Sequence, residues 1–177
     1  MPEKHHNSTR RLLSSRNTNR PERHQVEVSS GGFVFRRLRG RVEVVMLKDS
    51  YGRFTFPKGH VQAGESYVRG AQREIAEETG LKRVRYIRTL GHIDIWFRDR
   101  YVEKGKLIHK FIHYYLFEAP ADAVVRLPTP IAGGERIGDV LWVPLEEVYE
   151  RSGYKDLRPI IRRALETLEQ KRRKPVK

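Results

Sequence analysis

Residues 59–81 read GHVQAGESYVRGAQREIAEETGL, and this stretch decides the fold. Glu74, Glu77 and Glu78 within it are spaced i, i+3, i+4, which places all three carboxylates on one stripe of a helix. Stacked like charges destabilise a helix unless a cation neutralises them. Mg²⁺ and Mn²⁺ prefer oxygen ligands, so the stripe is interpreted as a metal site. A solvated acidic helix face is the alternative, and for an isolated E-x-x-E-E pattern it is the more common one.

The residues around the stripe favour the metal site. Gly59, Glu65, Arg73, the three glutamates and Gly80 stand at the spacing of the Nudix box and match it at every defined position. The chain therefore resembles the Nudix hydrolases, a superfamily that includes MutT-type nucleotide-sanitising enzymes and dinucleoside polyphosphate hydrolases. This resemblance implies hydrolysis of a phosphoanhydride bond with Mg²⁺ or Mn²⁺ as cofactor.

Composition predicts one domain with charged ends. A length of 177 residues is enough for one domain with its own core, and the net charge is +14. Residues 1–25 carry +4 and are expected to form a basic disordered arm, and residues 171–177 form a basic tail of +5. Residues 26–170 are expected to form the Nudix hydrolase domain. The tails are either solvated, disordered extensions or an electrostatic handle for nucleic acid or another polyanion.

The absence of cysteine excludes disulfides, thiolate zinc sites and thiol nucleophiles. Neither an apolar run of about eighteen residues nor a secretory leader is found, so a cytoplasmic protein without a membrane partner is expected. The sequence does not predict the oligomeric state.

Hydrophobic periodicity predicts strands over residues 26–35, 42–47, 54–56, 84–97, 107–117 and 140–143. Helices are predicted over residues 66–79, with Ser66 as N-cap and Gly80 as C-cap, and over residues 157–170. This pattern favours an α/β/α sandwich around a mixed β-sheet, and the resemblance implies the Nudix fold. Gly70 and Ala71, one turn before the glutamates, are expected to leave room for metal and phosphate.

Glu74, Glu77 and Glu78 are the predicted catalytic metal ligands. The resemblance implies a further ligand from a backbone carbonyl of the loop 56–60, which here is that of Lys58 or Gly59. It also implies that Glu65 and Arg73 form an ion pair that supports the ligating glutamates. Glu135 is the first candidate for general base or extra ligand, with a plain loop acid as the alternative, and Glu118 is a weaker candidate.

Five side chains are candidates for substrate contact. Arg53, Lys58 and His60 suit phosphate, with a structural loop role as the alternative for each. Trp96 and Tyr115 could stack on a nucleobase, although an aromatic residue of a sheet is more often part of the core.

The expected substrate is a nucleoside diphosphate-linked compound, and a dinucleoside polyphosphate or a (d)NTP is the favoured one. RNA 5′-pyrophosphohydrolysis is one alternative. A non-catalytic Nudix-like nucleotide-binding module is the other, and it is the less expected because such domains usually lose box glutamates that this chain retains.

Overall fold

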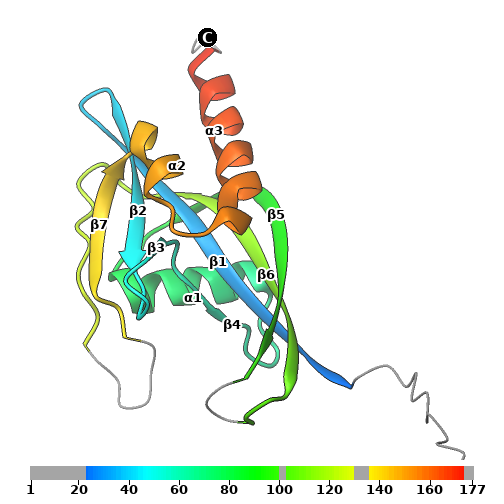
Figure 1. The fold of residues 1–177 in the computed structure, drawn as a ribbon. Coiled ribbons are helices and arrows are strands. Elements are labelled where there is room, and N and C mark those ends of the chain that lie inside the picture. Colours follow the sequence, from blue (N-terminus) through cyan, green and yellow to red (C-terminus); the bar gives the residue numbers. More distant parts are fainter. Residues whose placement is uncertain (1–22, 100–102, 130–135, 174–177) are drawn as a thin grey trace, which may run out of the picture.

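The structure is a computed structural model that describes residues 23–99, 103–129 and 136–173 (Figure 1). The strands are β1 (His24–Leu38), β2 (Arg41–Lys48), β3 (Phe54–Thr55), β4 (Lys58–His60), β5 (Arg85–Arg98), β6 (Leu107–Glu118) and β7 (Asp139–Pro144). The helices are α1 (Tyr67–Thr79), α2 (Val148–Arg151) and α3 (Arg158–Arg173), with 3₁₀ turns at Leu145–Glu147 and Lys155–Leu157.

All seven strands form one mixed sheet, with the order β3-β2-β1-β6-β5 along its main path. The long strand β1 lies at the centre, antiparallel to β2 and parallel to β6. Strand β5 is antiparallel to β6, β7 pairs with β2, and the short β4 pairs with β1. The parallel β1–β6 pair makes the sheet mixed, as predicted from the alternation of strands and helices.

Two hydrophobic cores cover the two faces of the sheet, because successive side chains of a strand point to opposite faces. On β1, Phe33 and Phe35 belong to the core beneath α3, whereas Val34 between them belongs to the core beneath α1. The remaining members of the α3 core include Val44, Met46, Ile160, Ile161, Ala164 and Leu168, and those of the α1 core include Val45, Ala71 and Ile75. The predicted α/β/α sandwich is confirmed (Figure 1).

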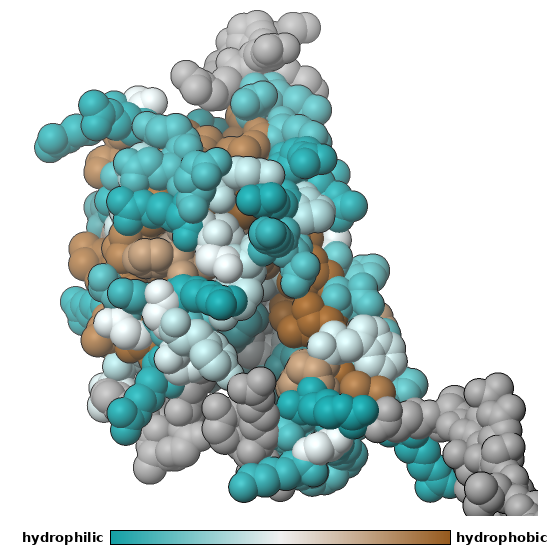
Figure 2. All heavy atoms as spheres, in the orientation of Figure 1, coloured by the Kyte–Doolittle hydropathy of each residue, from teal (hydrophilic) through white to brown (hydrophobic). Residues whose placement is uncertain are grey.

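The surface on the α3 side is mostly hydrophilic (Figure 2). Hydrophilic side chains gather at the β1–β2 hairpin, and apolar surface shows beside α3 over β5. On β5, Ile93 and Ile95 are partly buried against the α3 core, and Phe97 is 39% exposed. No helix among the described residues has both the length and the apolar composition needed to cross a membrane.

Strand β4 was not predicted, since residues 56–60 were read as a loop. Lys58, Gly59 and His60 pair with Gly31, Ser30 and Ser29 of β1. A Pro-Lys-Gly-His segment has low intrinsic strand propensity, and only its tertiary pairing makes it a strand. Gly31 permits this approach, because a Cβ atom there would lie 2.5 Å from the Pro57 carbonyl oxygen. The pairing places β4 beside β1 in the sheet and next to α1, where it forms one wall of the candidate site.

Candidate active site on helix α1

Helix α1 begins and ends where its capping residues predict. The Ser66 side chain accepts a hydrogen bond from the Arg69 backbone N–H at 3.3 Å, and Gly80 adopts the left-handed conformation at φ 76°. The Gly80 N–H donates to the Ala76 carbonyl oxygen and thereby satisfies a backbone acceptor of the last turn. With both ends fixed, Glu74, Glu77 and Glu78 lie within the last two turns of a regular helix.

Arg73 connects the acidic side chains of this region. Its Nη2 donates to Glu65 Oε1 at 2.7 Å, and its Nε donates to Glu65 Oε2 at 3.3 Å, which makes the pair bidentate. Its Nη1 donates to Glu74 Oε1 at 2.6 Å and to Glu77 Oε2 at 3.1 Å. Three carboxylates therefore share one guanidinium.

The same guanidinium holds the wall formed by β4. Arg73 Nη2 donates to the backbone carbonyl oxygen of His60 at 2.8 Å, so Arg73 joins the helix to the strand. The loop between them is fixed separately, because the Gln62 backbone N–H donates to Glu65 Oε1 at 2.7 Å. Sequence reasoning paired Arg73 with Glu65 alone. The i, i+4 spacing of Arg73 and Glu77 was a signal for the wider role.

Strand β4 lies directly against the glutamate stripe. A Cβ atom at Gly59 would lie 2.1 Å from Glu74 Cδ, so the Glu74 carboxylate occupies the space that a side chain at position 59 would fill. The Lys58 backbone N–H donates to Glu78 Oε2 at 2.9 Å. The backbone of residues 58 and 59 is thus next to two of the three predicted metal ligands.

Burial and charge act on the ionisation of this cluster in opposite directions. Glu74 is 9% exposed, and this burial raises the pKa of its carboxyl, against the opposing effect of Arg73. The hydrogen bond from Arg73 lowers the pKa of Glu65, and the Gln62 N–H acts in the same direction. Hydrogen bonding by Glu65 in turn raises the pKa of Arg73, so its guanidinium stays charged. The carboxylates that contact Arg73 outnumber this one cation.

The donor atoms of this cluster are all oxygens, which fits Mg²⁺ or Mn²⁺ by the preference of hard cations. Within the described part of the chain, no three His, Asp or Glu side chains converge closely enough to hold a metal ion. Arg73 instead bridges Glu74 and Glu77. A cavity of about 340 Å³ opens on this side of the helix, lined by Glu65, Arg69, Gln72 and Arg73.

The sequence predicts that Gly70 and Ala71 leave room for metal and phosphate. The structure contradicts this prediction. Ala71 is fully buried in the α1 core. A Cβ atom at Gly70 would lie 2.8 Å from Ser30 Oγ and 3.0 Å from Glu65 Oε1. Both residues are small because α1 packs closely on β1, and a larger side chain at either position would not fit between the helix and the sheet.

Some of the predicted substrate-contact residues lie near the carboxylate cluster of α1, and others lie away from it. Lys58 and His60 lie on β4 beside the cluster, and the His60 ring is 3.1 Å from Glu27 Oε2. Trp96 is 51% exposed and stacks on His109 with ring centroids 3.9 Å apart. The Arg53 guanidinium lies 5.4 Å from the centre of the Tyr154 ring, so the structure places it against the segment before α3.

Tyr115 belongs to the core, which is the more common position of an aromatic residue in a sheet, whereas the role of Glu135 remains a prediction. The Tyr115 ring is 7% exposed and packs in the α1 core, so it does not offer a free face to a nucleobase. Burial raises the pKa of its hydroxyl, with the nearby Tyr86 and Tyr67 acting in the same direction. Glu118 forms ion pairs with Arg37 and Arg85, outside the α1 cluster. Glu135 lies outside the described residues.

Comparison with protein families gives a match over most of the chain. The family model described as the NUDIX domain matches residues 26–164. Over 145 residues, the chain is 34% identical to a protein of Mycobacterium tuberculosis (strain CDC 1551 / Oshkosh) named as mutator protein MutT4. That match covers 75% of this chain and 52% of the relative, so the chain spans about half the length of that protein.

A second curated relative and a solved structure come from Caenorhabditis elegans. The asymmetrical bis(5′-nucleosyl)-tetraphosphatase of this organism is 28% identical over 137 residues, which cover 76% of this chain and 91% of that protein. The crystal structure of a C. elegans Ap4A hydrolase binary complex superposes with a TM-score of 0.64 at 24% identity. It covers 81% of this chain and 98% of that one, and this likeness shows the fold.

Proposed function

The chain belongs to the NUDIX domain family, and we propose that it is a hydrolase that cleaves a phosphoanhydride bond in a nucleoside diphosphate-linked compound. The observation that carries the proposal is the cluster in which Glu65, Glu74 and Glu77 share Arg73 while Glu78 is held by β4. Such a concentration of carboxylates beside a phosphate substrate needs a cation. The proposed cofactor is Mg²⁺ or Mn²⁺.

Glu74, Glu77 and Glu78 would hold the cation, with the backbone carbonyl of Lys58 or Gly59 as a further donor. A bound divalent cation would neutralise phosphate oxygens and acidify a water molecule. Arg73 and Glu65 position the ligating carboxylates, because their bidentate pair joins α1 to the loop that leaves β4. Glu135, seven residues before Trp142, is the proposed general base on its position in the sequence.

The proposed substrate is a dinucleoside polyphosphate or a (d)NTP. The name of the C. elegans relative, a bis(5′-nucleosyl)-tetraphosphatase, supports the first of these. Lys58 and His60 on β4 are proposed to contact phosphate, because their strand adjoins Glu74 and Glu78. The half-exposed Trp96 is proposed to stack on a nucleobase.

The experiment that tests the proposal replaces Glu78 by glutamine. Glu78→Gln keeps the size of the side chain and its acceptor oxygen for the Lys58 N–H but removes the negative charge. We expect turnover of diadenosine tetraphosphate with Mg²⁺ or Mn²⁺ to fall by at least about a hundredfold, with unchanged thermal unfolding. Glu147→Gln is the matched control, since Glu147 forms a surface ion pair with Arg151 outside the α1 cluster. Near wild-type turnover of Glu78→Gln would refute the metal-ligand assignment.

A substrate panel separates this function from two others. The basic segments 1–25 and 171–177 favour RNA as an alternative substrate. Diadenosine tetraphosphate, dATP and 5′-triphosphorylated RNA should therefore be compared, with the full chain and with a chain that lacks residues 1–25. Faster turnover of the RNA that depends on residues 1–25 would indicate an RNA 5′-pyrophosphohydrolase. Nucleotide binding without turnover of any of the three would indicate a binding module.

A further inference from the structure

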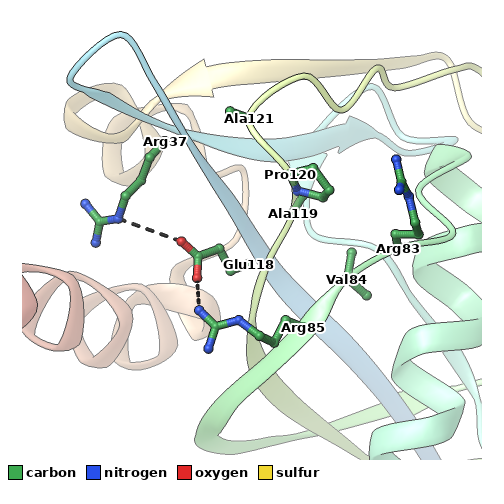
Figure 3. Close-up of a pocket in the computed structure, with 8 residues that line it drawn as sticks. All are labelled: Arg37, Arg83, Val84, Arg85, Glu118, Ala119, Pro120 and Ala121. Carbon is green, nitrogen blue, oxygen red and sulfur yellow. Dashed lines mark hydrogen bonds and ion pairs between the residues drawn. The ribbon is translucent and has the colours of Figure 1, made fainter.

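A second cavity does not lie at the α1 carboxylates. It has a volume of about 550 Å³ and opens where β1 and β6 end and β5 begins (Figure 3). Arg37 of β1 lines it, six residues beyond the Gly31 that contacts β4. At the rise of a strand, six residues span roughly 20 Å, so this cavity is separate from the proposed active site.

Three arginines from different parts of the chain line this cavity. Arg37 comes from the end of β1, Arg83 from the connection between α1 and β5, and Arg85 from the first position of β5. Glu118, the last residue of β6, is the acidic residue of the lining. The lining therefore has three cationic side chains and one anionic one, which is an excess of positive charge.

Glu118 forms ion pairs with two of the arginines. Its Oε1 lies 3.9 Å from Arg37 Nε, and its Oε2 accepts a hydrogen bond from Arg85 Nη2 (Figure 3). An arginine keeps further N–H donors after one such contact. Arg83 makes no hydrogen bond or ion pair with another residue in the described ranges. The cavity thus combines two positioned guanidiniums with one that has no protein partner among those residues.

Apolar side chains form the rest of the wall. Ala119 and Pro120 lie between Arg83 and the group of Arg37, Glu118 and Arg85 in the view of Figure 3, and Val84 adjoins Arg83. A ligand in this cavity therefore meets guanidinium groups, which attract anions, next to an apolar surface. Guanidinium groups prefer phosphate oxygens, and the volume lies within the range of sites for small molecules.

The surroundings strengthen the attraction for an anion. Arg39 and Arg41 of the β1–β2 hairpin are exposed, and so is Lys82 beside Arg83. Hydrophilic side chains cover the hairpin in Figure 2. Clustered charge of one sign around a concave surface raises the local concentration of an oppositely charged ligand.

We propose that this cavity is a second nucleotide site, which binds a nucleoside di- or triphosphate without hydrolysing it. The guanidiniums bind the phosphates, and the Val84, Ala119 and Pro120 surface contacts the nucleoside. The site differs from the α1 cluster in its charge, since it presents cations directly and has no stripe of carboxylates. Binding at this site therefore needs no divalent metal.

The test measures nucleotide binding by calorimetry with the full chain and with EDTA present. The probe is adenosine 5′-(β,γ-imido)triphosphate, which resists hydrolysis at the terminal phosphate. We expect Arg83→Glu to weaken binding by at least about tenfold, the loss of one charge-assisted hydrogen bond. Arg83→Gln should give a smaller loss in the same direction. Lys82→Glu is the matched control, because it makes the same charge change at an adjacent exposed position outside the lining.

Several results would overturn the proposal. One is an absence of binding by the wild-type chain in EDTA, and another is equal weakening by Arg83→Glu and Lys82→Glu, which would indicate diffuse surface attraction. Equal affinity for pyrophosphate would reject the nucleoside contact. Tighter binding of a single-stranded RNA, weakened equally by both charge reversals, would reject a nucleotide-sized site. Turnover with metal should be unchanged in Arg83→Glu, so this test fails or succeeds independently of the Glu78→Gln test.

Discussion

At the scale of single residues, the Glu74 carboxylate occupies the space next to the backbone of Gly59. The separation of 2.1 Å between a Cβ atom at position 59 and Glu74 Cδ is far below a van der Waals contact. A glycine at this position therefore serves the placement of a glutamate fifteen residues away in sequence. Its role is steric, whereas Gly64 and Gly80 serve turns with positive φ.

Gly59→Ala should displace Glu74 and impair the proposed reaction. We expect a loss of about 1–3 kcal/mol in the free energy of unfolding, as for other overpacked positions. Turnover should fall roughly a hundredfold, the effect of a misplacement of about 1 Å. Urea unfolding and steady-state kinetics measure both quantities.

Gly105→Ala is the matched control for this substitution. No heavy atom lies within 4 Å of a Cβ atom at position 105, and its φ is +86°, so only backbone strain is expected. That strain should cost about 1–2 kcal/mol and leave turnover unchanged. Wild-type turnover of Gly59→Ala would contradict the steric role given to Gly59.

At the scale of elements, helix α1 rests on β1 through a contact between a glycine and an isoleucine. A Cβ atom at Gly32 would lie 2.4 Å from Ile75 Cδ1, and both residues belong to the close interface beneath α1. This interface sets the height of the helix above the sheet, and with it the position of the glutamates against β4. The packing of α1 and the geometry of the proposed site are therefore one structural feature.

A double-mutant cycle tests this packing. Gly32→Ala alone should destabilise the fold by about 1–3 kcal/mol through overpacking. Ile75→Val alone should cost about 0.5–1.5 kcal/mol through a small cavity. The double variant should be more stable than the sum predicts by about 1 kcal/mol, because valine lacks the Cδ1 that meets the new methyl group.

The control cycle combines Gly32→Ala with Ile160→Val. Ile160 belongs to the other core, beneath α3, so its substitution leaves the contact of Gly32 unchanged. These two effects should add, as effects of separate sites do. Additivity of the Gly32 and Ile75 effects, measured by urea unfolding, would disprove the direct contact.

At the scale of the whole molecule, His113 links global stability to pH. This residue of β6 lies between His92, with ring centroids 5.3 Å apart, and Tyr67, with ring centroids 4.6 Å apart. Burial lowers the pKa of His113 below 6.5, and His92 acts in the same direction. Below pH 6.5 the unfolded chain therefore binds more protons at this residue than the folded chain does.

Stability should accordingly fall as the pH drops through 6.5, and part of this fall should be absent in His113→Gln. The measurement is the free energy of unfolding from urea titrations at pH values between 8 and 5. Above pH 7.5 the difference between the two proteins should be constant, since His113 is then neutral in both states. Parallel curves over the whole range would contradict the assigned role of His113.

The sequence predicted the fold through features that act over short distances. The caps Ser66 and Gly80 and the 3.6-residue spacing of α1 identified the helix to within one residue. The alternation of apolar residues identified the five longer strands to within a few residues at each end. Strand β4 was missed, because its residues have little strand propensity and its partner lies about thirty residues earlier.

The sequence predicted which residues form the candidate site, but it predicted only part of how their side chains are arranged. The residues of the Nudix box identified the candidate carboxylates, and the i, i+3, i+4 spacing predicted that they share one stripe of the helix. The burial of Ala71 was not predicted, because the pattern of a helix does not show how closely the neighbouring layer packs on a given residue. The cavity of Arg37, Arg83 and Arg85 had no signal in the sequence, because Arg37 lies about fifty residues before the two others.

The sequence by itself determined that a capped helix carries Glu74, Glu77 and Glu78 on one stripe, since the geometry of a helix depends on neighbours within a few residues. Only the tertiary structure decided that Arg73 holds three carboxylates together with the His60 carbonyl, and that Gly59 leaves the space for Glu74. It also decided that Arg37 of β1 lines one cavity together with Arg83, Arg85 and Glu118. The physical reason is that burial and charge pairing depend on which strands become neighbours, and that is a property of the whole sheet.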